Sequence, residues 1–272
     1  MSEQIKIGTN DKLQFDGIYS KGSKEKPAVL YIHGMFENFQ TPNFVKILEE
    51  KLYENDFAFL STNNRGAEEG SKYELLEEAH FDITAGIKFL LDKGYKQIIL
   101  IGHSAGTIKA VRYLFEGEFK DKVAKLVLVV PVDALGGRIA YGRTNIGEFL
   151  IKAEEKVTAG KGKELITSEF DHDMLSYQTF ISWYNRNELG RMFEFCDKKY
   201  DFPLLKKINL PTKIIVGTKD KYFYPTDPKH AEDAMKIILE NISNSEGKFI
   251  PNANHNFDGY ENELITEVMN FI

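Results

Sequence analysis

The sequence predicts an α/β protein built on a mostly parallel sheet with helices on both faces. Short apolar runs alternate with longer segments of helical period along most of the 272 residues, as the strands and crossover helices of a parallel sheet do. Several runs, such as IILIG at 98–102 and LVLVV at 126–130, are apolar at every position. Such runs are typical of central strands that are covered on both faces.

Each element follows from its own pattern of apolar residues. The runs that we predict as strands lie at 13–19, 28–32, 57–62, 97–102, 125–130, 212–217 and 247–251. Helical spacing of apolar residues predicts helices around 44–52, 83–91 and 264–272, and another helix follows the fourth run as TIKAVRYLFEG at 107–117. A later helix is expected to begin near His230.

One interval breaks this alternation. From about 134 to 204 no strand pattern is found, and aromatic residues stand among charged ones. We predict one domain over 1–272 that carries a mainly helical insertion, or lid, at about 134–204. Most of its aromatic residues are expected to form the insertion's own core, and one of them, Trp183, is a candidate for contact with a substrate. These aromatic residues are Tyr141, Phe149, Phe170, Tyr177, Phe180, Trp183, Tyr184, Phe193 and Phe195.

Composition and charge exclude several classes of protein. The chain is 42% hydrophobic and 28% charged, with a net charge of -6, and no dense Lys/Arg cluster provides the basic field that nucleic acid requires. The amino terminus lacks the pattern of a secretory signal, and no apolar run approaches the ~20 residues of a membrane span. A single cysteine, Cys196, excludes an internal disulfide. We therefore expect a cytoplasmic protein with neither nucleic-acid nor membrane partners, and its oligomeric state stays open.

The strongest functional signal is the pentapeptide GHSAG at 102–106. It follows a predicted strand directly and opens a predicted helix, and this is the placement of the G-x-S-x-G turn that presents a nucleophilic serine. The pattern makes Ser104 the candidate nucleophile. Its neighbour His103 is expected to point away from Ser104, and we also include it among the candidate substrate-binding residues.

A serine hydroxyl needs a base within hydrogen-bond reach. The candidates are the histidines of the chain, which are His33, His80, His103, His172, His230 and His255. We select His255, because it lies in the loop NANHNF after the last predicted strand, from which an imidazole can reach over the serine turn. The other five belong to other motifs, to helix starts or to the insertion.

Two carboxylates compete for the role of acid partner to His255. Asp220 follows the strand at 212–217 and lies between the serine and the histidine in sequence, in the order typical of such sheets. Asp133 follows the preceding strand and could reach the same ring. The sequence favours Asp220 without excluding Asp133. Asp227 and Asp258 are expected to cap helices or stabilise turns.

The remaining site predictions concern the loop after the strand at 28–32. Negative charge on a carbonyl oxygen requires waiting donors, for which we predict the backbone N–H groups of Ala105 and Met35. From the same loop, His33-Gly34-Met35-Phe36, we add His33, Gly34 and Phe36 to the candidate substrate-binding residues. No cofactor or metal is expected, since Asp171-His172-Asp173 has no second set of His or Cys ligands.

Together these motifs resemble the α/β-hydrolase superfamily over nearly the whole chain. HGMF, NNRG, GHSAG, GTKD and NHNF come in the expected order. Within that superfamily, the stretches at 73–114 and 155–166 are similar to the DUF1749 group, which includes fungal siderophore esterases. The resemblance implies hydrolysis of a polar ester, with Ser104, Asp220 and His255 as nucleophile, acid and base.

The hypothesis from sequence is thus a cofactor-independent serine hydrolase that cleaves small-molecule carboxylic esters through an acyl-enzyme intermediate. Thioester cleavage and acyl transfer are alternatives in the same site. A ligand-binding protein that retains the fold without the chemistry is the alternative from another class. A dehalogenase is disfavoured, because its nucleophile is a carboxylate whereas Ser104 occupies the turn here.

Overall fold

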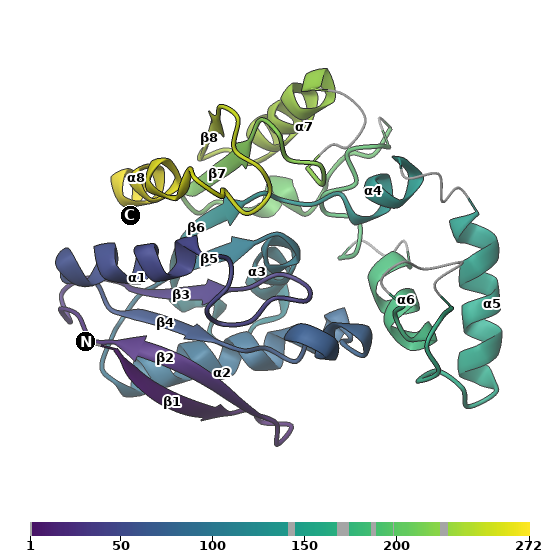
Figure 1. Cartoon of the computed structure of the whole chain (residues 1–272), viewed down its shortest axis with the longest axis horizontal. Helices are drawn as coiled ribbons and strands as arrows, with labels where there is room; N and C mark the ends of the chain where they lie inside the picture. The colour runs from purple at the N-terminus through teal and green to yellow at the C-terminus, as the bar shows by residue number, and fades with distance from the viewer. Residues whose placement is uncertain (1, 141–144, 168–173, 186–188, 198, 224–227) are drawn as a thin grey trace.

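Eight strands form one sheet in the order β1-β2-β4-β3-β5-β6-β7-β8 in the computed structural model (Figure 1). β1 and β2 pair antiparallel, β2 pairs antiparallel with β4, and all other pairs are parallel. The structure describes residues 2–140, 145–167, 174–185, 189–197, 199–223 and 228–272. The strands span Glu3–Gly8 (β1), Gln14–Ser20 (β2), Ala28–Ile32 (β3), Phe59–Thr62 (β4), Ile98–His103 (β5), Val123–Val129 (β6), Thr212–Gly217 (β7) and Ser245–Ile250 (β8).

Helices cover both faces of this sheet (Figure 1). They span Phe44–Glu54 (α1), Ala79–Asp92 (α2), Ala105–Glu116 (α3), Ala134–Ala140 (α4), Ile146–Thr158 (α5), Tyr177–Tyr184 (α6), Pro228–Asn241 (α7) and Glu261–Phe271 (α8), with short 3-10 helices at Glu68–Lys72, Leu76–Glu78, Lys120–Lys122 and Leu205–Lys207. α1 packs beside α8, and α2 packs beside α3.

Alternate residues of β3 show which helices lie on which face. Tyr31 packs edge-to-face against Phe44 of α1, with ring centroids 6.0 Å apart. The preceding residue, Leu30, points to the opposite face and fills the space beside Gly86 of α2. Since successive strand residues point to opposite faces, α1 and α2 cover opposite sides of the sheet.

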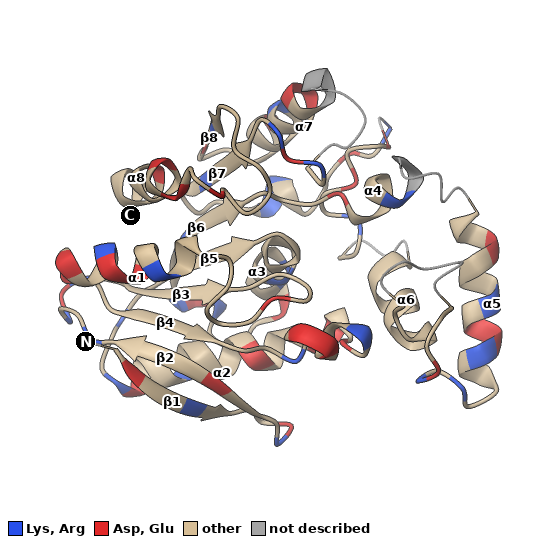
Figure 2. Cartoon of the chain, viewed as in Figure 1, with Lys and Arg blue, Asp and Glu red and all other residues tan. Residues whose placement is uncertain are grey.

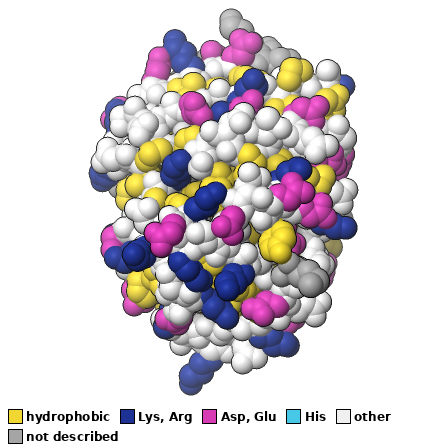
Figure 3. All heavy atoms as spheres, turned by 90° about the vertical axis from the view of Figure 1, so that its left-hand side faces the viewer, with side chains coloured by type: hydrophobic (Ala, Val, Ile, Leu, Met, Phe, Trp, Pro, Cys, Tyr) yellow, Lys and Arg dark blue, Asp and Glu magenta, His cyan; other side chains and the backbone are white. Residues whose placement is uncertain are grey.

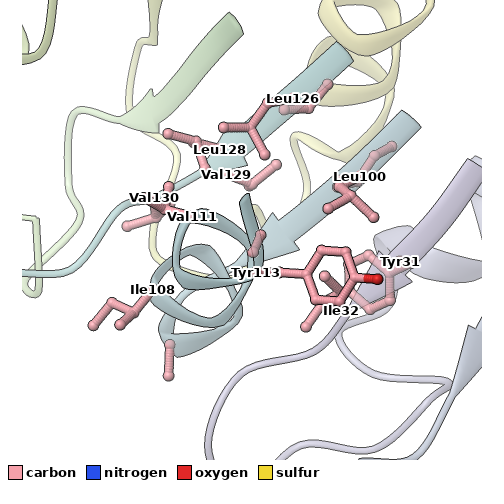
Figure 4. Packing of buried hydrophobic residues seen from close by; sticks show 14 of the residues in the cluster. Tyr31, Ile32, Leu100, Ile108, Val111, Tyr113, Leu126, Leu128, Val129 and Val130 are labelled. Atoms are coloured by element: carbon pink, nitrogen blue, oxygen red, sulfur yellow. The ribbon is translucent and has the colours of Figure 1, made fainter. Parts of the chain in front are cut away.

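The core is densest where α3 lies on the central strands. α3 contacts β5, β3 and β6, and Figure 4 shows this helix beside the strands that carry Leu100 and Leu126. β3, β5 and β7 are buried along their whole length, and this explains why their sequences are apolar at nearly every position. The helix that carries Ser104 at its start is therefore fixed by its own packing on the sheet.

All seven predicted strands are found, with ends that differ by up to two residues. The first strand, β1, is a difference from the prediction, because its sequence EQIKIG has only two strongly apolar residues. It forms an edge of the sheet and buries only Ile7. An edge strand with one face exposed to water needs little apolar sequence, so its pattern was too weak to predict.

The interval between β6 and β7 holds α4, α5 and α6, on the side of the molecule toward which the β3 and β5 arrows point (Figure 1). Phe149 of α5 packs edge-to-face on Phe180 of α6. α6 is fixed to the rest of the fold because the Leu76 N–H donates to Ser182 Oγ at 2.7 Å. The described aromatic residues of this interval that are buried are Tyr177, Phe180, Trp183, Tyr184, Phe193, Phe195 and Phe202. Tyr141 and Phe170 lie outside the described residues.

Most charged residues lie at the surface, and two of the central strands, β3 and β5, carry no Lys, Arg, Asp or Glu. Figure 2 shows both signs of charge along α5, whereas β3 and β5 carry none. On the face opposite the insertion, Lys and Arg side chains gather in the lower half of the view with Asp and Glu between them (Figure 3). Among the described residues, no helix combines the length and the apolar content needed to cross a membrane.

Candidate active site

Ser104 lies in the tight turn between the end of β5 and the start of α3. Its backbone has φ 54° and ψ -126°, a conformation that residues with a side chain rarely adopt. The surrounding structure enforces it, because the Ser104 N–H donates to the Val129 carbonyl at 3.0 Å and the Thr107 N–H donates to the Ser104 carbonyl at 2.9 Å. The turn lifts the Ser104 side chain away from the sheet, as predicted for a nucleophile turn.

The glycines that flank Ser104 are required by close backbone contacts. A Cβ on Gly106 would lie 2.1 Å from the Ile32 carbonyl oxygen. A Cβ on Gly102 would lie 2.5 Å from the Gly106 carbonyl oxygen. Both distances are far below van der Waals contact. The two glycines of GHSAG are therefore required for α3 to pack against the end of β3.

A chain of hydrogen bonds joins three residues from distant parts of the sequence. The Ser104 hydroxyl lies 2.9 Å from His255 Nε2, and His255 Nδ1 lies 2.5 Å from Asp220 Oδ2. Because a carboxylate only accepts hydrogen bonds, Nδ1 carries the proton and Nε2 offers its lone pair to the Ser104 hydroxyl. The structure brings together the three residues that the sequence selected, in the order Ser104, His255, Asp220.

Asp220 is held rigidly at the end of β7. Its second oxygen, Oδ1, accepts the N–H groups of Tyr222 at 2.6 Å and Phe223 at 2.7 Å. The Tyr222 ring lies edge-to-face on the His255 ring, with centroids 4.6 Å apart. These contacts fix both the carboxylate and the imidazole that it orients.

Asp133, the competing carboxylate, is engaged elsewhere. It is buried, and it accepts the Gly136 N–H at 2.6 Å and the Cys196 N–H at 2.8 Å. Asp133 therefore links the first turn after β6 to Cys196, which lies late in the interval between β6 and β7. Burial raises the pKa of Asp133 to about 6. Asp258 bonds to Asn254 within its own turn, and Asp227 lies outside the described residues.

The loop after β3 approaches Ser104 closely. A Cβ on Gly34 would lie 2.9 Å from the Ser104 Cβ, so Gly34 packs directly against the serine. In this loop the Gly34 N–H donates to Glu37 Oε2 at 2.6 Å, and the Phe36 N–H donates to Ser71 Oγ at 2.7 Å. No hydrogen bond between described residues uses the N–H of Met35 or that of Ala105. Both predicted oxyanion donors thus have no hydrogen-bond partner among the described residues.

His33 and His103 lie behind the site with no exposed surface. His33 Nδ1 donates to the Gly34 carbonyl at 2.8 Å, and His33 Nε2 accepts the Asn64 N–H at 3.1 Å. Burial, together with the nearby Lys109 ammonium, lowers the pKa of His33 to about 3. His33 is therefore neutral and supports the loop from within the protein.

Asn64 and Lys109 continue this support into the core. Lys109 Nζ, on α3, donates to Asn64 Oδ1 at 3.1 Å and pairs with Glu74 at 2.6 Å. Both charged side chains are almost fully buried. A buried pair of this kind is costly to break, so the NNRG segment at 63–66 serves as scaffold for the loop after β3. Sequence reasoning used NNRG only as a family motif.

The other candidate substrate-binding residues occupy different environments. The Phe36 side chain is 40% exposed beside the site. Trp183 is buried in α6, and its indole Nε1 has no hydrogen-bond partner among the described residues. His80 bonds through Nδ1 to the Glu77 carbonyl at the start of α2. His172, with its neighbours in Asp171-His172-Asp173, lies outside the described residues, as does the side chain of His230.

Sequence reasoning missed Glu37. This carboxylate accepts the Gly34 N–H and contacts His103 Nδ1 at 3.0–3.1 Å. A signal was present in the sequence, because His103 adjoins the candidate nucleophile Ser104 without an assigned partner. The loop that must face His103 contains an acidic residue. Without the spatial arrangement, however, Glu37 could not be distinguished from any exposed loop glutamate.

The strand order, the turn at Ser104 and the position of the hydrogen-bonded side chains at the strand ends define an α/β hydrolase fold. Residues 7–193 match the family described as a protein of unknown function, DUF1749. The chain belongs to this DUF1749 family. No curated protein matches the chain in sequence.

Solved structures with the same fold include several hydrolases. An α/β hydrolase fold protein of unknown function is 15% identical with a TM-score of 0.74, over 100% of this chain and 94% of the other. Est1E of Butyrivibrio proteoclasticus with bound ferulic acid is 15% identical with a TM-score of 0.70, over 98% and 97%. The Pyrococcus furiosus esterase Pf2001 is 17% identical with a TM-score of 0.64, over 100% and 90%. At these identities the likeness shows the shared fold.

Proposed function

We propose that this protein is a cofactor-independent serine hydrolase that cleaves carboxylic esters of small molecules through an acyl-enzyme intermediate. The observation that carries the proposal is the continuous hydrogen-bond chain from the Ser104 hydroxyl through His255 to Asp220. The likeness of the fold to an esterase, to a ferulate-bound protein and to a monoglyceride lipase of Saccharomyces cerevisiae supports the same class of reaction. The lipase is 16% identical with a TM-score of 0.67.

In the proposed acylation step, Ser104 Oγ attacks the ester carbonyl carbon as His255 Nε2 takes the hydroxyl proton. The carbonyl oxygen becomes an oxyanion that the N–H groups of Ala105 and Met35 stabilise. Collapse of the intermediate breaks the bond to the alcohol oxygen, which receives the proton from His255. Asp220 keeps the proton of His255 on Nδ1 and stabilises the imidazolium that forms.

Deacylation repeats these roles with water. His255 removes a proton from the water, the hydroxide adds to the acyl carbonyl, and the carboxylic acid leaves as Ser104 regains its proton. The α4–α6 interval lies on the same side of the molecule as the strand ends that carry the site. We propose that it acts as a lid that bounds the acyl pocket.

The test uses Ser104→Ala with p-nitrophenyl esters from acetate upward. We expect the variant to lose hydrolysis by about 10⁴-fold or more and to lose covalent labelling by a fluorophosphonate. Ser23→Ala is the matched control, because Ser23 is a half-buried serine in the loop before β3, outside the site, and it should keep both properties.

Hydrolysis that survives in Ser104→Ala would refute the proposal. Labelling of Ser104 without turnover of oxygen esters would exclude the ester substrates and favour thioesters or acyl transfer. Absence of both labelling and turnover, with tight ligand binding, would assign the fold to a binding protein instead.

A further inference from the structure

His103 adjoins the proposed nucleophile, yet its ring does not contact the serine. Its Nδ1 lies 3.0 Å and 3.1 Å from the two carboxylate oxygens of Glu37, and its Nε2 lies 3.0 Å from the backbone carbonyl oxygen of His255. The ring has no exposed surface. One buried imidazole thus joins three chain segments: the loop after β3, the turn at the nucleophile and the loop that carries the base.

The hydrogen-bond partners of His103 indicate how many protons its ring carries. A backbone carbonyl and an ionised carboxylate both accept hydrogen bonds and donate none. Satisfying both therefore requires N–H groups on both ring nitrogens, and a neutral imidazole has only one. Glu37 Oε2 also accepts the Gly34 N–H at 2.6 Å, so this carboxylate is already in use as an acceptor. The arrangement fits an imidazolium–carboxylate pair.

We propose that His103 and Glu37 form a positioning pair for the proposed hydrolase site. Doubly protonated His103 donates to the His255 backbone carbonyl and so holds the loop that carries His255. Loss of one proton from His103 at alkaline pH breaks this hydrogen bond and slows the reaction. The proposal rests on the proposed function for its kinetic part. The proton that remains after deprotonation stays on Nδ1, because the charged carboxylate is the stronger acceptor. The bare Nε2 then faces a carbonyl oxygen, and two lone pairs repel.

The electrostatic surroundings support this charge state. Burial lowers the pKa of His103, but the Glu37 carboxylate outweighs burial and the net effect raises the pKa above its usual value. Burial raises the pKa of Glu37, and the contacts with His103 and the Gly34 N–H outweigh burial and lower it. The other titratable groups that face the pair are His255, whose ring centroid lies 5.0 Å from that of His103, and Asp220 and His33. Phe44 of α1 covers the remaining side.

Two substitutions of His103 separate its two hydrogen bonds. The amide N–H of Gln occupies the position of Nε2 in His103→Gln and can donate to the His255 carbonyl. In His103→Asn the amide reaches only the Nδ1 position and the Glu37 carboxylate. We expect His103→Asn to slow fluorophosphonate labelling of Ser104 by about 10- to 100-fold more than His103→Gln, as a misplaced base does.

Glu37→Gln tests the proton count. Its amide oxygen can accept the Gly34 N–H while its amide N–H donates to Nδ1, so a neutral His103 with the proton on Nε2 completes every hydrogen bond. Wild-type labelling should fall with pH above the usual histidine range, with the slope of one proton. In Glu37→Gln the rate, relative to its own value at pH 7, should not fall in this way. His80→Gln, a histidine outside the site, should reproduce the wild-type profile.

A spectroscopic measurement keeps the test independent of turnover. With 15N-histidine, the chain gives signals from six histidines, and His103 is assigned by its absence in His103→Gln. We expect both ring nitrogens of His103 to be protonated at pH 7 in the wild type and only one in Glu37→Gln. A single N–H on wild-type His103, an unchanged alkaline fall in Glu37→Gln, or equal losses in the two His103 variants would overturn the proposal. Failure of the proposed function is distinguishable, because Ser104 would then resist labelling while the proton count on His103 could still be measured.

Discussion

Asp133 and Asp220 illustrate how neighbours decide what a carboxylate does. Each follows the end of a central strand, and sequence alone left both as partners for His255. Asp220 Oδ2 meets the imidazole. Asp133 is turned toward the backbone of the insertion, where it accepts two N–H groups and is buried.

The raised pKa of Asp133 predicts a stability effect with a defined sign. Burial raises its pKa from 3.8 to about 6, so between these values the folded state binds more protons than the unfolded state. The free energy of unfolding should therefore fall as pH rises from about 4 to 7, relative to Asp133→Asn, by about 3 kcal/mol, since one pKa unit is worth about 1.4 kcal/mol. Urea unfolding of both proteins at a series of pH values measures this difference.

Asp133→Asn also loses one hydrogen bond, because its NH₂ replaces an acceptor. That loss shifts the whole curve by a constant amount and leaves the slope with pH unaffected. Parallel stability curves for the two proteins would show that Asp133 titrates normally.

The chemistry of a turn and the order of motifs were enough to select Ser104, His255 and Asp220, three side chains that the structure joins by hydrogen bonds. Each requirement is local to one strand end, and the sheet then aligns the ends. Glu37 and Lys109 could not be predicted in the same way. Their roles depend on which side chain they contact in the folded protein. Glu37 contacts His103 and Lys109 contacts Glu74, and no sequence pattern predicts either contact.

At the scale of elements, the junction between β5 and α3 requires glycine at position 106, because no Cβ fits there. We expect Gly106→Ala to destabilise the protein by at least about 2 kcal/mol and to abolish labelling of Ser104. Its Cβ would lie 2.1 Å from the Ile32 carbonyl oxygen, and relief of that clash must move the loop after β3 away from the nucleophile. Chemical denaturation and fluorophosphonate labelling measure the two effects.

Gly147→Ala is the matched control for this prediction. Gly147 lies in α5, and a Cβ there meets nothing within 4 Å. Alanine favours a helix over glycine by up to about 1 kcal/mol, so the same substitution should leave stability equal or higher. A Gly106→Ala protein as stable and as reactive as Gly147→Ala would contradict the steric argument.

Predictability of the elements followed their burial. The central strands were found because both faces are buried and each contains a continuous apolar run, such as AVLYI in β3, IILI in β5 and IIV in β7. β1 was missed because it pairs only with β2 at the edge and exposes most of its residues. The helices of the insertion could be expected only as a class, since their aromatic residues pack mainly on one another.

At the scale of the whole molecule, the sheet and the insertion share one buried core that includes Trp183. We expect them to unfold in a single cooperative transition. The chain has one tryptophan, and it lies in α6, so tryptophan fluorescence reports on the insertion while far-UV circular dichroism reports mainly on the remaining helices and strands. Coincident urea transitions by the two probes are the expected result.

A fluorescence transition at lower urea than the circular dichroism transition would show instead that the insertion unfolds on its own. Trp183→Phe is the control, because it should abolish the fluorescence change and leave the circular dichroism transition in place. Its buried position makes a modest loss of stability the expected cost of that change.

The two hydrogen bonds of Asp133 affect how far the length of the chain between β6 and β7 can vary. Asp133 accepts the backbone N–H of Gly136, just after β6, and that of Cys196, which precedes β7. The two points of the chain that flank the segment between them are therefore held side by side. The entropic cost of closing a loop rises only slowly with its length, so segments of very different length can connect these two points of the chain. We therefore expect that the segment between Gly136 and Cys196 can be lengthened or shortened at little cost while the strand ends that carry the site stay in place.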